Sequence, residues 1–173
     1  MTKEIDKKKN SHILAEVKKR KKKGKIVDVE EEKVKLVIFS LLDDFYAIYA
    51  KDIKEILLVE KITFVPGSPD YILGIINVRG NIESVLNINK FIGIPDSKID
   101  KNSRIVIASN VDMRSGILVD SVVDVVDVPK KSITPPTSTL SKTLKDFVVG
   151  EVVYGDKSIT HLDIIKKFES ITG

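Results

Sequence analysis

Few side chains in this sequence are suited to catalysis or metal binding at neutral pH. The chain has no cysteine and only two histidines, His12 and His161, which excludes thiol catalysis and thiolate metal sites. His12 lies in a highly charged stretch, and alternation places His161 opposite Leu162, which favours a surface or half-buried histidine over a catalytic one. No Ser, His and Asp group can be assembled. We therefore predict a non-enzymatic protein with no catalytic residue, no metal site and no cofactor.

The remaining carboxylates and glycines also form no recognisable site. Asp43 and Asp44 fall in a predicted turn, and Asp120 and Asp124 lie along an alternating strand, where outward aspartates are ordinary. The glycines are scattered, and no predicted strand leads into a G-x-x-x-x-G-K or G-x-G-x-x-G phosphate loop. The sequence therefore gives no support for acid–base catalysis or nucleotide binding.

One segment, Asn77-Val78-Arg79-Gly80-Asn81, does carry a functional signal. Arg79 is one of only three arginines in residues 34–173, and it directly precedes a glycine at a predicted hairpin. A guanidinium held by a turn offers five donors in fixed directions to the carbonyls or carboxylates of a partner. An ordinary hairpin arginine is the other interpretation, and the residues alone leave both open.

The positive charge of the chain belongs to its N-terminal segment. Residues 1–33 hold 12 of the 29 basic and 7 of the 25 acidic residues, which leaves residues 34–173 nearly neutral. Because residues 1–33 contain few apolar side chains, we predict a mostly disordered basic arm. It either contacts anionic lipid or nucleic acid, or serves as a solubilising tail. The lack of cysteine and of a signal-peptide or membrane-spanning apolar run favours a cytoplasmic protein.

From residue 34 onward the sequence is typical of an all-β domain, because short β-branched runs alternate with turn residues. Its composition and length suit a single core without disulfides or metals. The expected strands are 34–42, 45–50, 71–78 and 82–88, with a turn at Asp43-Asp44 and a short helix at 89–92. Residues 51–57 fit a helical turn or a bent strand equally well.

The second half of the domain repeats the pattern of the first. Ile38, Ile48 and Ile53 match Ile107, Ile117 and Val122 at a constant offset of 69 residues. Tyr71-Ile72-Leu73-Gly74 and Leu86-Asn87-Ile88 match Phe147-Val148-Val149-Gly150 and Leu162-Asp163-Ile164 at an offset of 76. A loop-like stretch at 135–142 can contain the seven extra residues. Two copies of one small β module are therefore predicted, although apolar alternation alone can mimic such a repeat.

These motifs resemble the CheW family of chemotaxis coupling proteins. The family pattern has an aromatic-rich hairpin, V-x-E-I, V-P-x-x-P-x-[YF]-[IV]-x-G, the hallmark N-[LV]-R-G, and two later motifs, G-[IL]-[LV]-V-D-x-V and a closing L-D-[IL]. The corresponding segments here are Phe45–Ile48, Ile53–Ile56, Val65–Gly74, Asn77–Gly80, Gly116–Val122 and His161–Lys167. The resemblance covers residues 34 to about 168. Two departures follow the hallmark: Ser84 stands where the family usually has proline, and Asn87 where it has aspartate.

The resemblance implies two five-stranded SH3-like β-barrels packed across a shared core, with short helices. The first barrel would span about residues 34–100 and the second about 101–173, with possible strand exchange. It also implies an adapter that couples methyl-accepting chemotaxis receptors to the regulatory domain of a CheA-type histidine kinase and is recruited to membrane receptor arrays. By position, the receptor-binding residues would be Glu55, Gly74, Asn77, Arg79 and Gly80. The kinase-binding patch would be Val37, Ala50, Ile53 and Ile56, for which a plain core role is the alternative.

An alternative function is a small-barrel protein that docks on nucleic acid or a membrane through its basic arm. Nucleic-acid binding by the barrels themselves would call for basic residues interleaved with exposed aromatics. The domain has no tryptophan, and Phe39, Tyr46 and Phe91 occupy core-like positions. This alternative therefore depends on the arm.

Overall fold

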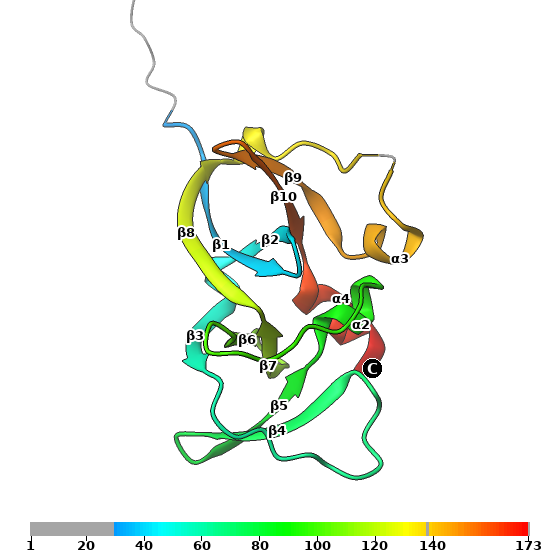
Figure 1. Cartoon of the computed structure of the whole chain (residues 1–173). Helices are drawn as coiled ribbons and strands as arrows, with labels where there is room; N and C mark the ends of the chain where they lie inside the picture. Colours follow the sequence, from blue (N-terminus) through cyan, green and yellow to red (C-terminus); the bar gives the residue numbers. More distant parts are fainter. Residues whose placement is uncertain (1–29, 138, 173) are drawn as a thin grey trace, which may run out of the picture. The chain divides into compact units, whose positions relative to one another are not determined.

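Two five-stranded sheets form the body of the protein in a computed structural model that describes residues 30–137 and 139–172 (Figure 1). Sheet A has the order β8 (Ser121–Pro129), β1 (Lys33–Leu41), β2 (Asp44–Tyr49), β10 (Lys157–Leu162) and β9 (Val148–Tyr154). Sheet B has the order β3 (Ile53–Leu58), β6 (Arg104–Ser109), β7 (Arg114–Val119), β5 (Asn81–Leu86) and β4 (Ile72–Val78). The all-β prediction is confirmed.

The helices are short and lie mostly next to strand ends. They are η1 (Ala50–Asp52), α2 (Ile88–Ile92), η2 (Lys130–Ser132), α3 (Lys142–Lys145) and α4 (Ile164–Thr172). Within the described ranges, none is both long and apolar enough to cross a membrane. The contacts between residues divide the chain into two units, with the boundary after Glu31. Both sheets belong to the unit that begins at Glu32. Of the predicted basic arm, residues 1–29 lie outside the described residues.

The structure reproduces the internal repeat strand by strand. β9 and β10 follow β4 and β5 at an offset of 76 residues, and β8 overlaps β3 at an offset of 69. The two sheets also share one order of strands, and each contains one parallel pair at the same place, β2 with β10 and β7 with β5. The protein is therefore built from two copies of one β module.

The two modules exchange strands. β1 and β2 of the first half join β8, β9 and β10 in sheet A, while β6 and β7 of the second half join β3, β4 and β5 in sheet B. Each sheet therefore combines strands from residues 34–100 with strands from residues 101–173, the two ranges that the family resemblance implied for the barrels, with possible strand exchange. Hydrogen-bonded pairing also stops at the outer strands, β8 and β9 in sheet A and β3 and β4 in sheet B, so neither sheet is a closed barrel.

Three apolar clusters account for the packing. One lies within sheet A and includes Leu36 and Ile159, and another lies within sheet B and includes Val85 and Ile107. The largest joins both sheets to α2, α3 and α4, and Phe39 is among its buried members. This is the shared core that the family resemblance implies. Burial of large apolar side chains drives such packing, at about 25 cal/mol per Å² removed from water.

Gly74 and Gly150 occupy equivalent places in the two modules, and both are needed for the same reason. A Cβ atom on Gly74 would lie 2.3 Å from the carbonyl oxygen of Thr63, and one on Gly150 would lie 2.5 Å from that of Thr134. In each module an incoming segment pairs with the strand beside its glycine. The repeated aromatic-x-x-Gly pattern of the sequence therefore marks a close backbone crossing.

Local differences from the predicted elements are small. The first hairpin turn is Leu42-Asp43 instead of Asp43-Asp44. Residues 50–52 form a 3₁₀ turn and 53–58 a strand, so both interpretations of this stretch hold in part. Asn87 caps α2, because its side chain accepts a hydrogen bond from the backbone N–H of Asn89, and Gly93 ends that helix in the left-handed conformation.

Candidate functional site: a charged hairpin beside an apolar groove

The β4–β5 hairpin presents Arg79 to solvent on a two-residue turn. Val78 pairs with Asn81, and both central residues have positive φ, 52° at Arg79 and 89° at Gly80. This is the pattern of a type I′ turn, which matches the twist of the flanking strands. The side-chain oxygen of Asn77 accepts a hydrogen bond of 2.8 Å from the N–H of Gly80. The turn therefore fixes the backbone of Arg79, while its side chain is 83% exposed.

Four charged side chains converge at this hairpin. Nη2 of Arg79 lies 3.1 Å from Oε2 of Glu55 on β3, and Nη2 of Arg114 on β7 lies 3.3 Å from Oε1 of the same carboxylate. Nε of Arg114 lies 2.7 Å from Oε1 of Glu83 on β5. We call Glu55, Arg79, Glu83 and Arg114 the charge cluster. It links the hairpin to β7 at the centre of sheet B and to β3 at the opposite edge, and its formal charges balance.

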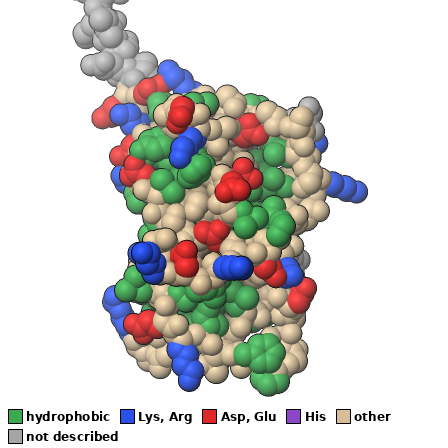
Figure 2. Space-filling view, viewed as in Figure 1, with side chains coloured by type: hydrophobic (Ala, Val, Ile, Leu, Met, Phe, Trp, Pro, Cys, Tyr) green, Lys and Arg blue, Asp and Glu red, His purple; other side chains and the backbone are tan. Residues whose placement is uncertain are grey.

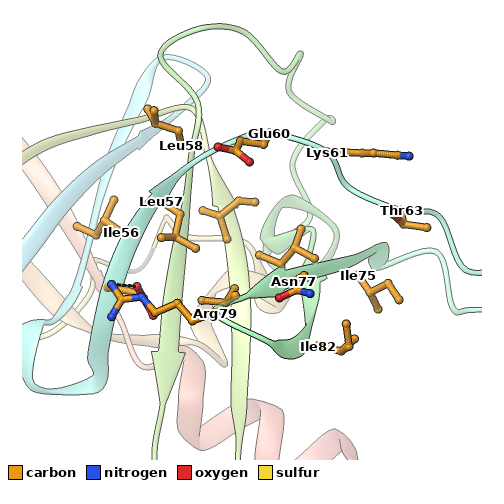
Figure 3. Close-up of a pocket in the computed structure, with 14 residues that line it drawn as sticks. Ile56, Leu57, Leu58, Glu60, Lys61, Thr63, Ile75, Asn77, Arg79 and Ile82 are labelled. Carbon is orange, nitrogen blue, oxygen red and sulfur yellow. Dashed lines mark ion pairs between the residues drawn. The ribbon is translucent and has the colours of Figure 1, made fainter.

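An apolar groove of about 610 Å³ adjoins the charge cluster, between β3 and β4 (Figure 3). Ile56, Leu58 and Ile82 line it and are all exposed. Figure 2 shows hydrophobic side chains on both halves of this face, with acidic and basic side chains in a band between them. Exposed apolar area rimmed by charge is typical of a protein-binding surface.

The structure brings together four of the five residues predicted to bind a receptor. Glu55, Asn77, Arg79 and Gly80 lie at the hairpin and its charge cluster. Gly74 is different, because it is buried where the backbone near Thr63 crosses β4. Its place in the family motif has a structural explanation, and it offers no side chain to a partner.

The residues predicted for kinase binding do not form one exposed patch. Val37 is 3% exposed, so it is a core residue and has almost no surface to offer. Ala50 and Ile53 are half-buried, and Ile53 packs against the shared core. Ile56 is 38% exposed and lines the groove. Of the four, Ile56 presents the most accessible side chain.

Two members of the charge cluster, Glu83 and Arg114, escaped the sequence analysis. Arg114 was visible as one of three arginines in residues 34–173, but nothing local connects it to Arg79. Glu83 is buried on β5 while its neighbour Ile82 is exposed, which reverses the expected orientation of the two residue types. The pair forms only because β5 and β7 lie side by side in sheet B.

The histidine that could serve as a base is fully buried, which corrects the prediction of a surface or half-buried side chain. His161 is 0% exposed, and its ring meets Tyr49 edge-on at 4.2 Å between centroids. Burial lowers the pKa of His161 to about 4, opposed by the nearby charge of Asp163. Neither ring nitrogen has a hydrogen-bond partner in the described part of the chain. Among the described residues, no group of three potential ligands could hold a metal ion.

Comparison with known proteins decides the family. A family model described as a CheW-like domain matches residues 35–171. The chain belongs to the CheW-like family. The chemotaxis protein CheW of Treponema pallidum is 27% identical over 146 residues, which cover 82% of this chain and 86% of that protein. CheW of Thermotoga maritima is 34% identical over 120 residues, 67% of this chain and 76% of that protein.

A solved structure supports the same assignment. The scaffolding protein TtCheW from Thermoanaerobacter tengcongensis is 34% identical, with a TM-score of 0.69 over 77% of this chain and 86% of its own. The predicted membership of the CheW family is thus confirmed. It supports a scaffold or adapter role in chemotaxis for this CheW-like chain.

Both departures from the usual CheW motif have local partners. Ser84 replaces the proline, and its hydroxyl lies 3.0 Å from that of Ser115 on β7. Asn87 replaces the aspartate and still caps α2, while its amide nitrogen donates to Asp96. The strand that carries the hairpin is therefore tied to its neighbour at the site of the missing proline.

Proposed function

We propose that this chain is a non-enzymatic adapter that couples methyl-accepting chemotaxis receptors to a CheA-type histidine kinase. The observation that carries the proposal is the exposed Arg79, which is fixed by a two-residue turn and backed by the Glu55 carboxylate. Such a guanidinium can donate to backbone carbonyls and carboxylates at the tip of a receptor hairpin. The adapter would act in the cytoplasm, where receptors recruit it to their arrays.

The receptor side of the adapter is assigned to the hairpin. Asn77 and Gly80 shape the turn, Glu55 anchors the guanidinium, and Arg79 makes the contact. Gly74 lets the preceding loop cross β4 and so supports the hairpin from behind.

The kinase side is assigned to the β3 edge of sheet B. Ile56 supplies accessible apolar area there, with Ile53 and Ala50 half-buried beside it and Val37 supporting from the core. Apolar anchors on one partner that fill pockets on the other are the usual source of interface energy. Ile56 lines the same groove as Arg79, so the two assigned sites are neighbours on sheet B, and the adapter would hold both partners side by side.

A binding comparison tests the receptor assignment. The full chain is titrated by calorimetry with a soluble fragment of a receptor's cytoplasmic tip and, separately, with the kinase regulatory domain. Arg79→Ala should lower the affinity for the tip by about tenfold or more, the value of a charge-assisted hydrogen bond, and leave the kinase affinity unchanged. Arg104→Ala is the matched control, because the guanidinium of Arg104 donates to the backbone carbonyls of Lys101 and Ser103 outside the charge cluster. Unchanged tip affinity in Arg79→Ala would remove the hairpin from the receptor site.

A further inference from the structure

The Glu55 carboxylate is shared by two arginines that differ greatly in how firmly they are held. Arg79 is 83% exposed, and its Nη2 lies 3.1 Å from Oε2, a buried oxygen that accepts no hydrogen bond among the described residues. Arg114 is 36% exposed, donates a hydrogen bond to Oε1, and is also paired through Nε with Glu83 at 2.7 Å. Since Glu83 is itself buried, Arg114 is held at two of its three guanidinium nitrogens, at Nη2 by Glu55 and at Nε by Glu83.

This difference decides what happens if Arg79 turns toward a partner. The side chain of Glu55 is only 19% exposed, and a charge that is largely removed from water resists losing its sole counter-ion. With Arg114 in place, Glu55 keeps one cation after Arg79 departs. The Oε2 atom is then free to accept a hydrogen bond from a donor on the partner.

The other sheet shows that these charges are not required to form a sheet of this kind. At the repeat offsets of 69 and 76, Arg114 corresponds to Phe45 and Glu83 to Ile159, both in the apolar cluster of sheet A. The counterpart of Glu55 is Asp124, which accepts a hydrogen bond from Tyr154 and forms no ion pair with an arginine of the described residues. The same module therefore packs with an apolar pair where sheet B has the Arg114–Glu83 ion pair.

We infer that Arg114, anchored by Glu83, is a positioning residue that keeps Glu55 compensated and so makes Arg79 available to the receptor. The inference rests on the proposed function, because it names the residue that adjusts the receptor contact. Arg114 acts through Glu55 and does not itself touch the partner.

The repeat supplies the variant for the test. Glu83→Ile combined with Arg114→Phe installs in sheet B the pair that sheet A already accommodates, and among the described residues it leaves Arg79 as the sole cation paired with Glu55. The motion of the Arg79 guanidinium is measured by ¹⁵N relaxation of its side-chain N–H in the full chain, which has only four arginines to assign. Affinity for the receptor tip fragment and for the kinase regulatory domain is measured in parallel.

In the double variant, Arg79 should become less mobile, and affinity for the tip should fall by up to about fivefold, the range of an ion pair near the surface. Kinase affinity should stay unchanged, and Arg114→Lys, which keeps the charge, should retain most of the tip affinity. Arg114→Gln removes the charge with little change of shape and serves as the test if the double variant does not fold. Equal Arg79 mobility and equal tip affinity in the wild-type and charge-removed proteins would overturn the inference. If the wild-type protein does not bind the tip, the proposed function fails, and the Arg79 relaxation still decides the role of Arg114.

Discussion

Stability should fall in mild acid because of one buried side chain, His161. Its pKa of about 4 in the folded protein lies below the value of about 6.5 in an unfolded chain. Between these two values the unfolded chain binds more protons, so stability is fully present above about pH 6.5 and is lost as the pH falls toward 4. From pH 7 to pH 5 this linkage amounts to a loss of about 2 kcal/mol in the free energy of unfolding.

The perturbation that isolates this effect is His161→Leu. Both ring nitrogens of His161 lack hydrogen-bond partners among the described residues, so an apolar side chain of similar size should leave stability at pH 7 equal or higher. Urea unfolding of both proteins at pH 7, 6 and 5 gives the two pH dependences. The wild-type protein should lose about 2 kcal/mol more than the variant across this range. Parallel losses in the two proteins would refute the assignment to His161.

Three further predictions concern Ile56 in the groove, Val37 in the core and the N-terminal arm. Ile56→Asp should reduce affinity for the kinase regulatory domain by about tenfold with little change in melting temperature, because the side chain is exposed; Val37→Asp should instead unfold the domain, since it buries an unpaired charge. Calorimetry and circular dichroism check both, and intact kinase affinity in Ile56→Asp would remove this residue from the interface. Deletion of residues 1–29 should leave the melting temperature and kinase affinity unchanged, because β1 begins at Lys33 and Glu32 still pairs with Lys130. If the deletion instead abolished salt-dependent binding to nucleic acid or anionic vesicles, the alternative function of the arm would be favoured.

Only the family resemblance implied a possible exchange of strands, and the residue pattern by itself does not decide which strands are exchanged. Because the two modules are alike, the β1–β2 hairpin presents the same alternating pattern whichever half it joins. The alternation of residue types shows that five strands form a module. Contacts between residues far apart in the sequence decide which five strands share a sheet. The first turn is similar: Leu42 adopts a positive φ of 54°, which leucine rarely does, and its N–H donates to Asp120 at 2.6 Å across 78 residues.

The candidate site was predictable to the extent that its residues are close in sequence. Asn77, Arg79 and Gly80 form one turn with strong local rules, so their motif identified the hairpin. Glu83 and Arg114 meet only through the pairing of β5 with β7, and a buried glutamate looks unfavourable until its arginine is known. The groove escaped prediction for the same reason, since β3 and β4 face each other only in the folded sheet.

The measurement that tests the central claim most directly is receptor-dependent kinase activation in a reconstituted mixture of receptor, kinase and this chain. Phosphorylation of the kinase is followed with the wild-type chain, with Arg79→Ala, with Arg79→Lys and without any adapter. The account predicts strong activation by the wild-type chain, loss of activation with Arg79→Ala at unchanged kinase affinity, and partial recovery with Arg79→Lys, because lysine keeps the charge but not the donor geometry. Full activation by Arg79→Ala, or no activation by the wild-type chain, would contradict it.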